Sequence, residues 1–273
     1  MVSHNCLSGL SNINIELTNR CNKNCWMCGR RKVERDFSEL ALNYGDMQFS
    51  LVEKIARQLP NNIMVQLHNN GEALLYPRFG EAAKLFKNQI TNIVTNGKLL
   101  VEKSEDIIDN LDTLAISVFE KDDEAGEQYE IIKDFLKIKG NRKPFTIFRL
   151  NGDVKGEKYK KLGIIARRVI HSQMGSFNYQ KKQPMVPEVG ICLDFLHHMA
   201  INREGLVSIC VRFDPKGLGV LGSCNKQTLE EIWNGELRLK WLELHKKGKR
   251  SDIPLCSFCE FWGVPTGCDF DGD

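Results

Sequence analysis

Seven of the ten cysteines in this 273-residue chain fall into a triplet, a pair and one spaced couple, and this clustering constrains the fold more than any other feature. The amino terminus lacks the basic and apolar blocks of an export signal, and a chain of this length does not need disulfides to fold. Clustered thiols in a reducing compartment are held by metal or used in redox chemistry. We therefore expect a cytoplasmic metalloprotein.

Composition excludes several partners. Lys and Arg number 38 against 35 Asp and Glu, so a net charge of +3 makes no case for nucleic-acid binding. The basic run at 245–250 is typical of a solvated helix end. No segment approaches the roughly 20 apolar residues of a membrane span. We predict no nucleic-acid partner and no membrane partner.

The first two thirds of the chain alternate extended apolar runs with segments of helical spacing, which predicts an α/β fold with a parallel sheet, open or curled into part of a barrel. Catalytic groups should then gather at the carboxyl ends of the strands. The predicted strands are 13–17, 63–67, 89–95, 114–118, 145–150 and 176–180, and the predicted helices are 49–59, 82–86, 100–110 and 125–138.

A change in composition at 181–190, rich in proline, predicts a boundary between a core domain (1–185) and a smaller domain (186–273). In the second domain, strands 193–201 and 206–211 should flank a tight turn that contains Gly205. Thr228 should then cap a long helix.

The triplet Cys21, Cys25 and Cys28 has the spacing C-x3-C-x2-C and follows the first strand. Three thiolates on one short loop can hold three corners of a cubane iron–sulfur cluster and leave the fourth iron free for a ligand. The alternative is a zinc site, which needs a fourth ligand such as His68. The spacing favours the cluster.

Together with the segment at 68–77 and Thr95-Asn96-Gly97, this triplet resembles the radical S-adenosylmethionine (SAM) superfamily. The resemblance implies a partial (β/α)6 TIM barrel, a SAM-binding [4Fe–4S] cluster and bound SAM. Where the family carries Gly-Gly-Glu-Pro, this chain has Asn70 for the first Gly and Ala73 for Pro. The cofactor-binding residues implied are Asn70, Gly71, Glu72, Asn96, Ser117 (ribose) and Arg149 (carboxylate).

A second set of four thiols comprises Cys192, Cys210, Cys256 and Cys259. Spacing alone leaves open a closed structural zinc site. In its context the set resembles the twitch or SPASM extension of radical SAM enzymes, a β-hairpin plus helix, and above all the compact members that oxidise aminocyclitols. That resemblance implies one auxiliary [4Fe–4S] cluster. Cys224 and Cys268 are then spare thiols or hydrogen donors.

These features predict an enzyme that reductively cleaves SAM to a 5′-deoxyadenosyl radical. The radical would abstract hydrogen from a polar small molecule, such as a sugar, aminoglycoside or cyclitol, and the carbinol carbon would be oxidised or epimerised. Flavodoxin or ferredoxin would supply electrons. The candidate catalytic residues are Arg149, His197, His198, Cys224 and Cys268, with His68 and His171 as further proton acceptors.

Two other functions remain open. One is radical modification of a peptide by thioether formation, epimerisation or crosslinking. It is disfavoured because the first strand begins near Ile13, which leaves no room for a leader-binding domain. The other is a zinc-stabilised binding protein without catalysis, against which the three-thiol loop argues.

Overall fold

The computed structural model describes residues 7–168, 170 and 191–259. Within these residues the strands form one sheet, in the order β6-β5-β4-β3-β2-β1-β7-β8-β9. The strands are β1 (Asn12–Ile15), β2 (Met64–Gln66), β3 (Ile90–Thr95), β4 (Thr113–Phe119), β5 (Phe145–Asn151), β6 (Ile164–Arg168), β7 (His198–Ile201), β8 (Leu206–Ser208) and β9 (Val220–Ser223). Strands β1 to β6 pair in parallel, and β7, β8 and β9 pair antiparallel. The predicted α/β partial barrel with a C-terminal hairpin is confirmed.

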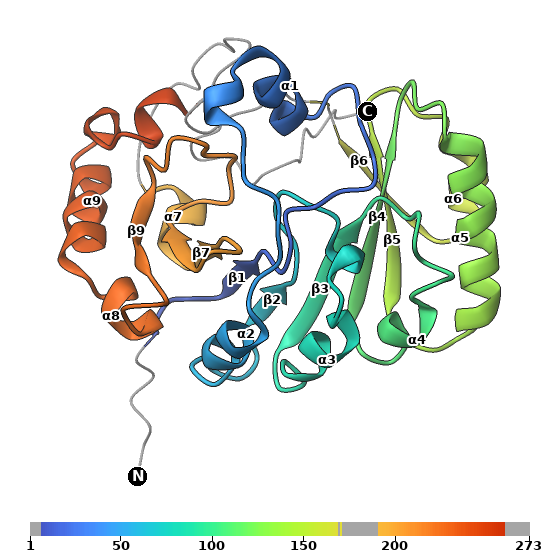
Figure 1. Cartoon of the computed structure of the whole chain (residues 1–273), viewed down its shortest axis with the longest axis horizontal. Helices are drawn as coiled ribbons and strands as arrows, with labels where there is room; N and C mark the ends of the chain where they lie inside the picture. The colour runs from blue at the N-terminus through green and yellow to red at the C-terminus, as the bar shows by residue number, and fades with distance from the viewer. Residues whose placement is uncertain (1–6, 169, 171–190, 260–273) are drawn as a thin grey trace.

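Helices cover the outside of this sheet. They are α1 (Gly29–Asp36), α2 (Phe49–Ala56), α3 (Phe79–Lys84), α4 (Ser104–Ile107), α5 (Ala125–Lys139), α6 (Glu157–Lys160), α7 (Leu193–His197), α8 (Leu229–Trp233) and α9 (Glu236–Lys246). In Figure 1, α2, α3, α4 and α5 follow the curve of the barrel, while α8 and α9 lie beyond β9 on the opposite side. The longest, α5, ends at Gly140 as predicted, where φ is +55°.

Five of the six predicted barrel strands coincide with β1 to β5. The weak candidate at 176–180 lies outside the described residues, and the strand that extends the sheet beyond β5 is Ile164–Arg168. Its sequence carries only three apolar residues before two arginines, so it lacks the continuous apolar run expected of a buried parallel strand. The predicted boundary between residues 185 and 186 also lies outside the described residues and stays a prediction.

The prediction of one strand over 193–201 is wrong in its first half. Residues Leu193–His197 form the short helix α7, which buries Phe195, and only His198–Ile201 form a strand. The adjoining turn is as predicted, with Gly205 at φ +82°. Thr228 caps α8 in a capping box with Glu231, but the helix breaks before α9.

The two faces of the barrel strands differ in chemistry, because side chains alternate along a strand. Ile13 and Ile15 of β1, like Phe148 and Leu150 of β5, are fully buried against the helices. The residues between them are polar and face the barrel interior, among them Asn14 and Arg149. The interior of the barrel is therefore lined by polar side chains.

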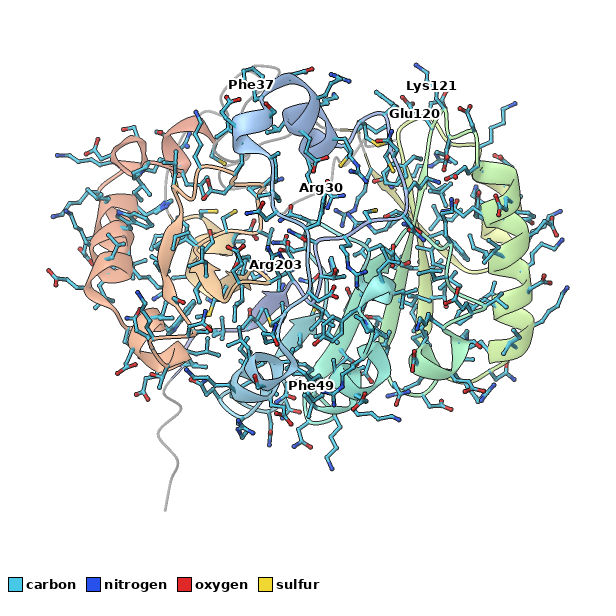
Figure 2. The ribbon with its side chains drawn as sticks, in the orientation of Figure 1. Arg30, Phe37, Phe49, Glu120, Lys121 and Arg203 are labelled. Atoms are coloured by element: carbon cyan, nitrogen blue, oxygen red, sulfur yellow. The ribbon has the colours of Figure 1, made fainter. Side chains whose placement is uncertain are left out.

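The C-terminal hairpin is part of the same sheet. Strand β7 pairs in parallel with β1 over four residues, from Asn12↔His198 to Ile15↔Ile201. In the β7–β8 turn lies Arg203, which Figure 2 labels. It donates from Nε and Nη2 to the carbonyl oxygen of Asn43, at 3.1 and 2.9 Å. Among the described residues, no helix is both long enough and apolar enough to cross a bilayer.

Candidate functional site

The cysteine loop joins β1 to α1 at the carboxyl ends of the barrel strands. Cys21, Cys25 and Cys28 all line a pocket of about 560 Å³, which we call the first cysteine pocket. Burial raises the pKa of Cys25 to about 12, and the nearby thiols of Cys28 and Cys21 add to the rise. The three thiols therefore lie near one another, as ligands of one metal centre must.

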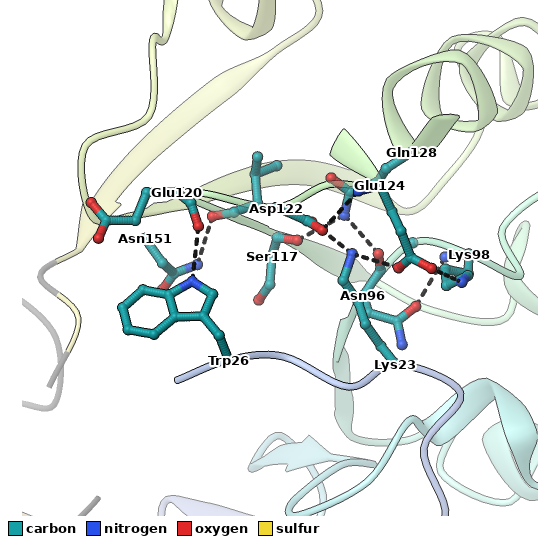
Figure 3. Close-up of polar contacts among 12 residues, drawn as sticks. Lys23, Trp26, Asn96, Lys98, Ser117, Glu120, Asp122, Glu124, Gln128 and Asn151 are labelled. Atoms are coloured by element: carbon teal, nitrogen blue, oxygen red, sulfur yellow. Dashed lines mark hydrogen bonds and ion pairs between the residues drawn. The ribbon is translucent and has the colours of Figure 1, made fainter. Parts of the chain in front are cut away.

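A buried ion-pair network clamps this loop to the connection between β4 and α5 (Figure 3). Lys23 Nζ lies 2.6 Å from Asp122 Oδ2 and 3.2 Å from Glu124 Oε2, and the Lys23 side chain is 5% exposed. Lys98 completes the network at 2.6 Å from Glu124 Oε1. Trp26, also on the loop, donates its indole N–H to the carbonyl of Glu120 at 3.1 Å. The loop is thus held at two points between its first and its last cysteine.

The segment after β2 passes very close to the cysteine loop, and this close approach explains why residue 71 is a glycine. A Cβ atom at Gly71 would meet the carbonyl oxygens of Thr18 and Arg20 at 2.5 and 2.7 Å. The next backbone N–H, of Glu72, donates to Arg20 O at 2.8 Å. Only glycine permits this approach of two backbones.

The Glu72 carboxylate connects neighbouring segments of this site by hydrogen bonds. It accepts hydrogen bonds from Leu74 N, Thr95 Oγ1 and Asn96 N, at 3.2, 2.8 and 2.7 Å. Burial raises its pKa, while these hydrogen bonds favour the charged form. The Asn96 side chain in turn donates to Asn22 Oδ1 at 2.8 Å, next to Cys21. The ends of β2 and β3 and the cysteine loop therefore form one hydrogen-bonded unit.

The far wall of the pocket comes from the ends of β4, β5 and β6. Ser117 of β4 pairs with Arg149 of β5, and Asn151 pairs with Arg168 of β6, so these side chains share one face. Gln128 of α5 donates to the carbonyls of Ser117 and Asn96, at 2.9 and 2.6 Å, and fixes the wall from behind. Burial, with the neighbouring Arg168, lowers the pKa of Arg149 to about 10.

A chain of polar contacts crosses from β2 to β7. Asn14 donates from Nδ2 to the His68 carbonyl at 2.8 Å, which leaves its Oδ1 to accept from His198 Nε2 at 2.7 Å. His198 therefore carries a proton on Nε2, and its Nδ1 lies 3.8 Å from Asp194 Oδ1. The backbone N–H of Val94 donates to His68 Nδ1 at 3.2 Å, and burial lowers the pKa of His68 to about 3. His68 is accordingly neutral, with its proton on Nε2.

The second set of thiols also converges, as predicted. Cys192, Cys210, Cys256 and Cys259 line a small pocket of about 30 Å³, the second cysteine pocket. It is packed by apolar side chains that include Phe195, Ile209 and Leu255. Burial raises the pKa of Cys256 to about 12 and raises that of Cys210 as well. His245 Nε2 lies 3.7 Å from Cys256 Sγ, and its ring stacks on Phe195.

The two pockets share a wall. Asp194 and Arg212 line both the first and the second cysteine pocket. Asp194 comes from α7, two residues after Cys192, and Arg212 lies two residues after Cys210. These two side chains therefore form part of the wall between the two pockets.

Every predicted cofactor-binding residue lines the first pocket: Asn70, Gly71, Glu72, Asn96, Ser117 and Arg149. Of the predicted catalytic residues, Arg149 and His198 line it too. His197 does not, because its Nδ1 contacts the carbonyl of Gly9 at 2.8 Å. Cys268 and His171 lie outside the described residues.

Cys224 is not brought to the pocket. The residue is fully buried in the hydrophobic core, and its carbonyl accepts a hydrogen bond from Lys54 at 2.5 Å. A lone buried thiol packs as a small apolar side chain. Its predicted role as a hydrogen donor therefore has no support in the structure.

The sequence analysis missed Asn14, Arg168, Asp194 and Arg212. Asp194 and Arg212 each lie two positions after a cysteine of the second set, and that spacing was the only available signal for them.

Among residues 7–168, 170 and 191–259, no three His, Cys, Asp or Glu side chains are arranged to hold one metal ion. A zinc ion binds its thiolates at about 2.3 Å from one point, whereas in a cubane cluster each thiolate binds a different iron.

Comparison with known proteins agrees with this site. Residues 192–260 match the model of the SPASM domain, an iron–sulfur cluster-binding domain. The S-adenosyl-L-methionine-dependent 2-deoxy-scyllo-inosamine dehydrogenase of Niallia circulans is 23% identical over 269 residues, which cover 96% of this chain and 97% of that enzyme. The chain is thus similar to a SAM-dependent dehydrogenase over nearly its whole length, and residues 192–260 match an iron–sulfur cluster-binding domain.

Further comparisons extend this result. A cofactor-modifying protein for the tungsten-containing aldehyde ferredoxin oxidoreductase of Pyrococcus furiosus is 28% identical over 230 residues, 75% of this chain and 60% of that protein. The crystal structure of BtrN with AdoMet and 2-DOIA superposes with a TM-score of 0.62 at 18% identity, over 94% of this chain and 95% of that one. The crystal structure of Streptococcus suis SuiB bound to S-adenosylmethionine superposes with a TM-score of 0.59 at 14% identity. This superposition covers 93% of this chain and 73% of SuiB. At these identities the superpositions establish the shared fold.

Proposed function

We propose that this protein is a radical SAM oxidoreductase that oxidises a carbinol carbon of a polar small molecule to a ketone. The observation that carries the proposal is the shared wall of Asp194 and Arg212 between the two cysteine pockets. A substrate in the first pocket would lie beside the three-thiol loop on one side and the four-thiol set on the other. Such an arrangement suits oxidation of an alcohol by a radical, because the hydrogen atom and the electron that leave the substrate go to two different acceptors.

The first pocket would hold the SAM-binding [4Fe–4S] cluster on Cys21, Cys25 and Cys28, and the second an auxiliary [4Fe–4S] cluster on its four thiolates. When bound, the loop cluster and SAM supply a 5′-deoxyadenosyl radical that takes the hydrogen atom. Backbone groups of Asn70, Gly71 and Glu72 would bind the SAM amino group, with Asn96 and Ser117 along the same wall. Arg149 faces either the SAM carboxylate or the substrate.

We propose that Nδ1 of His198 accepts the proton of the substrate hydroxyl. The hydrogen bond from Nε2 to Asn14 Oδ1 leaves Nδ1 to accept the proton, and Asp194 at 3.8 Å would stabilise the imidazolium that forms. The alcohol would lose one hydrogen atom, one proton and one electron. An auxiliary cluster held by the four thiols would accept the electron, and flavodoxin or ferredoxin would exchange electrons with the enzyme.

Epimerisation is less well supported, because it needs a thiol that returns a hydrogen atom in the pocket. Cys224 packs in the core, so the described residues outside the two ligand sets offer no such thiol.

The test is anaerobic reconstitution with iron and sulfide, followed by incubation with SAM and dithionite and assay of 5′-deoxyadenosine. We expect acid-labile sulfide in the protein and 5′-deoxyadenosine in the reaction, both reduced in Cys28→Ala. Zinc without acid-labile sulfide, or sulfide without any 5′-deoxyadenosine, would contradict the proposal.

A further inference from the structure

Glu16 is a buried carboxylate that the proposed function does not use. It follows β1 at the carboxyl end of the barrel strands and is 2% exposed. It lines a cavity of about 100 Å³ but not the first cysteine pocket, whereas Asn70 lines both. Burying a carboxylate is unfavourable unless hydrogen bonds satisfy it, so the partners of Glu16 indicate its role.

The two carboxylate oxygens of Glu16 hold two different segments of the chain. Oε2 accepts from both the backbone N–H and the side-chain amide of Asn70, at 3.0 and 2.8 Å. Oε1 accepts from the backbone N–H of Arg203, in the β7–β8 turn, at 3.3 Å. Burial raises the pKa of Glu16, while these hydrogen bonds and the nearby charge of Arg30 lower it. Because all three partners are N–H donors, the ionised carboxylate is the form that satisfies them.

Asn70 carries this contact to the first cysteine pocket. A carboxylate only accepts hydrogen bonds, so the amide nitrogen of Asn70 must face Glu16. The Gly-Gly-Glu-Pro motif of the radical SAM superfamily has glycine at this position, which offers no side chain to hold. Two residues later, the backbone N–H of Glu72 donates to the cysteine loop at the carbonyl oxygen of Arg20. The turn at 70–72 is therefore held from two sides.

Arg203 gives the carboxylate its second attachment, in the C-terminal hairpin. Residues 202–205 form a tight turn in which the Gly205 N–H donates to the Asn202 carbonyl at 2.9 Å, and Arg203 is the second residue of that turn. The backbone N–H of Arg203 takes no part in the turn's own hydrogen bond and donates to Glu16 instead. One carboxylate therefore connects the hairpin to a turn that lines the first cysteine pocket.

We propose that Glu16 is a positioning residue that couples the C-terminal hairpin to the SAM site through Asn70. This inference rests on the proposed function, in which backbone groups at 70–72 bind the SAM amino group. The ionised carboxylate fixes that turn before SAM binds, so less ordering accompanies binding. Loss of either attachment would let the turn move and would weaken SAM binding.

The first experiment measures SAM binding to the anaerobically reconstituted protein by isothermal titration. The parent should show one SAM site. Glu16→Gln should bind SAM about tenfold more weakly, because its NH2 group would face an N–H donor on one side. Glu102→Gln, which changes an exposed carboxylate outside both cavities, is the control and should bind as the parent does. Equal SAM affinity in Glu16→Gln and the parent would overturn the proposal.

The second experiment tests the coupling through Arg203. Arg203→Pro removes the backbone N–H that reaches Glu16, and proline suits the second position of a tight turn. Arg203→Gln keeps that N–H and removes the guanidinium contacts with the Asn43 carbonyl. We expect SAM affinity to fall about threefold or more in Arg203→Pro and to change little in Arg203→Gln. Equal SAM affinity in these two variants would contradict the coupling.

A second ligand separates positioning from general damage to the pocket. 5′-Methylthioadenosine shares the adenosine and sulfur of SAM but lacks its amino and carboxylate groups. Its affinity should be the same in the parent, Glu16→Gln and Arg203→Pro, and an equal loss for both ligands would refute the proposal. Should Glu16→Gln fail to bind iron, the two Arg203 variants carry the same comparison. Formation of 5′-deoxyadenosine by the parent tests the proposed function separately, because SAM can bind without being cleaved.

Discussion

The two cysteine pockets differ in size, lining and ligand number. The first measures about 560 Å³ and is lined by polar and charged side chains around three thiols. The second measures about 30 Å³ and packs four thiols among Phe195, Ile209 and Leu255. Three protein ligands leave a coordination position open beside space for a ligand, while four ligands in a tight apolar shell close a site. In the proposed function, this difference would separate a centre that binds reactants from one that only passes electrons.

The strongest test of this difference between the pockets is to remove one thiol from each. Cys28→Ala should abolish 5′-deoxyadenosine formation, because the centre that binds SAM loses a ligand. Cys256→Ala should leave that formation near the parent's level, since it removes only a ligand of the closed site. Chromatographic assay of 5′-deoxyadenosine, with iron and sulfide counted per chain, checks both. Equal loss in the two variants would contradict separate roles.

Close backbone approach distinguishes the first pocket, and Gly71→Ala tests it. The new Cβ would meet backbone atoms of Thr18, Asn19 and Arg20 at 2.5 to 2.8 Å, so the loop must move. We expect a loss of about 3 kcal/mol of unfolding free energy and less iron on the loop. Gly126→Ala, with nothing within 4 Å of its Cβ, should be neutral or slightly stabilising. Urea unfolding and iron analysis provide the measurements; similar losses in both variants would argue against the close approach.

The ion-pair network of the cysteine loop is the next target. Asp122→Asn leaves Lys23 buried, with only Glu124 at 3.2 Å. We expect a loss of about 2 kcal/mol, less than for a fully isolated buried charge because Glu124 remains. Asp134→Asn, which removes an exposed pair with Lys137, should have little effect. Thermal and urea unfolding of both variants would show whether burial sets the difference.

A pH effect should come from His68. Its folded-state pKa of about 3 lies below the ordinary value of 6.5, so the unfolded chain takes up a proton first as the pH falls. The stabilisation is complete above pH 6.5 and is lost toward pH 3, at up to about 1.4 kcal/mol per pH unit. His68→Asn should remove this contribution from the slope between pH 6.5 and 5. An unchanged slope in urea unfolding at several pH values would contradict the neutral, buried histidine.

The smallest expected effect concerns the second pocket. His245 Nε2 lies 3.7 Å from Cys256 Sγ, and a hydrogen bond to a cluster thiolate raises the reduction potential. His245→Phe keeps the stacking on Phe195 and removes the N–H, so the auxiliary cluster should become harder to reduce. Redox titration followed by electron paramagnetic resonance measures this, and the loop cluster is the internal reference. A shift in both clusters would point to a general structural change.

Sequence alone grouped both sets of thiols, for two different reasons. Cys21, Cys25 and Cys28 lie on one short loop, whereas the second set spans residues 192–259 and was grouped by its resemblance to a known cluster-binding extension. It also located five strands, the stop of α5 at Gly140 and the cap at Thr228. It missed Arg168 and Asp194, whose positions depend on tertiary structure: Arg168 faces the pocket through the register of β6, and Asp194 through the short helix α7. Cys224 is the opposite case: the sequence allowed it a role as a hydrogen donor, but it packs in the hydrophobic core.

The pairing of β1 with β7 has a consequence for electron transfer. The cysteine loop leaves the end of β1, and Cys192 and Cys210 flank the hairpin that begins with β7. If each set of thiols holds a cluster, as proposed, the tunnelling distance between the two clusters would be fixed by backbone hydrogen bonds within one sheet. Changes in the length of the chain between the two halves should leave that distance, and with it the rate of intramolecular electron transfer, intact.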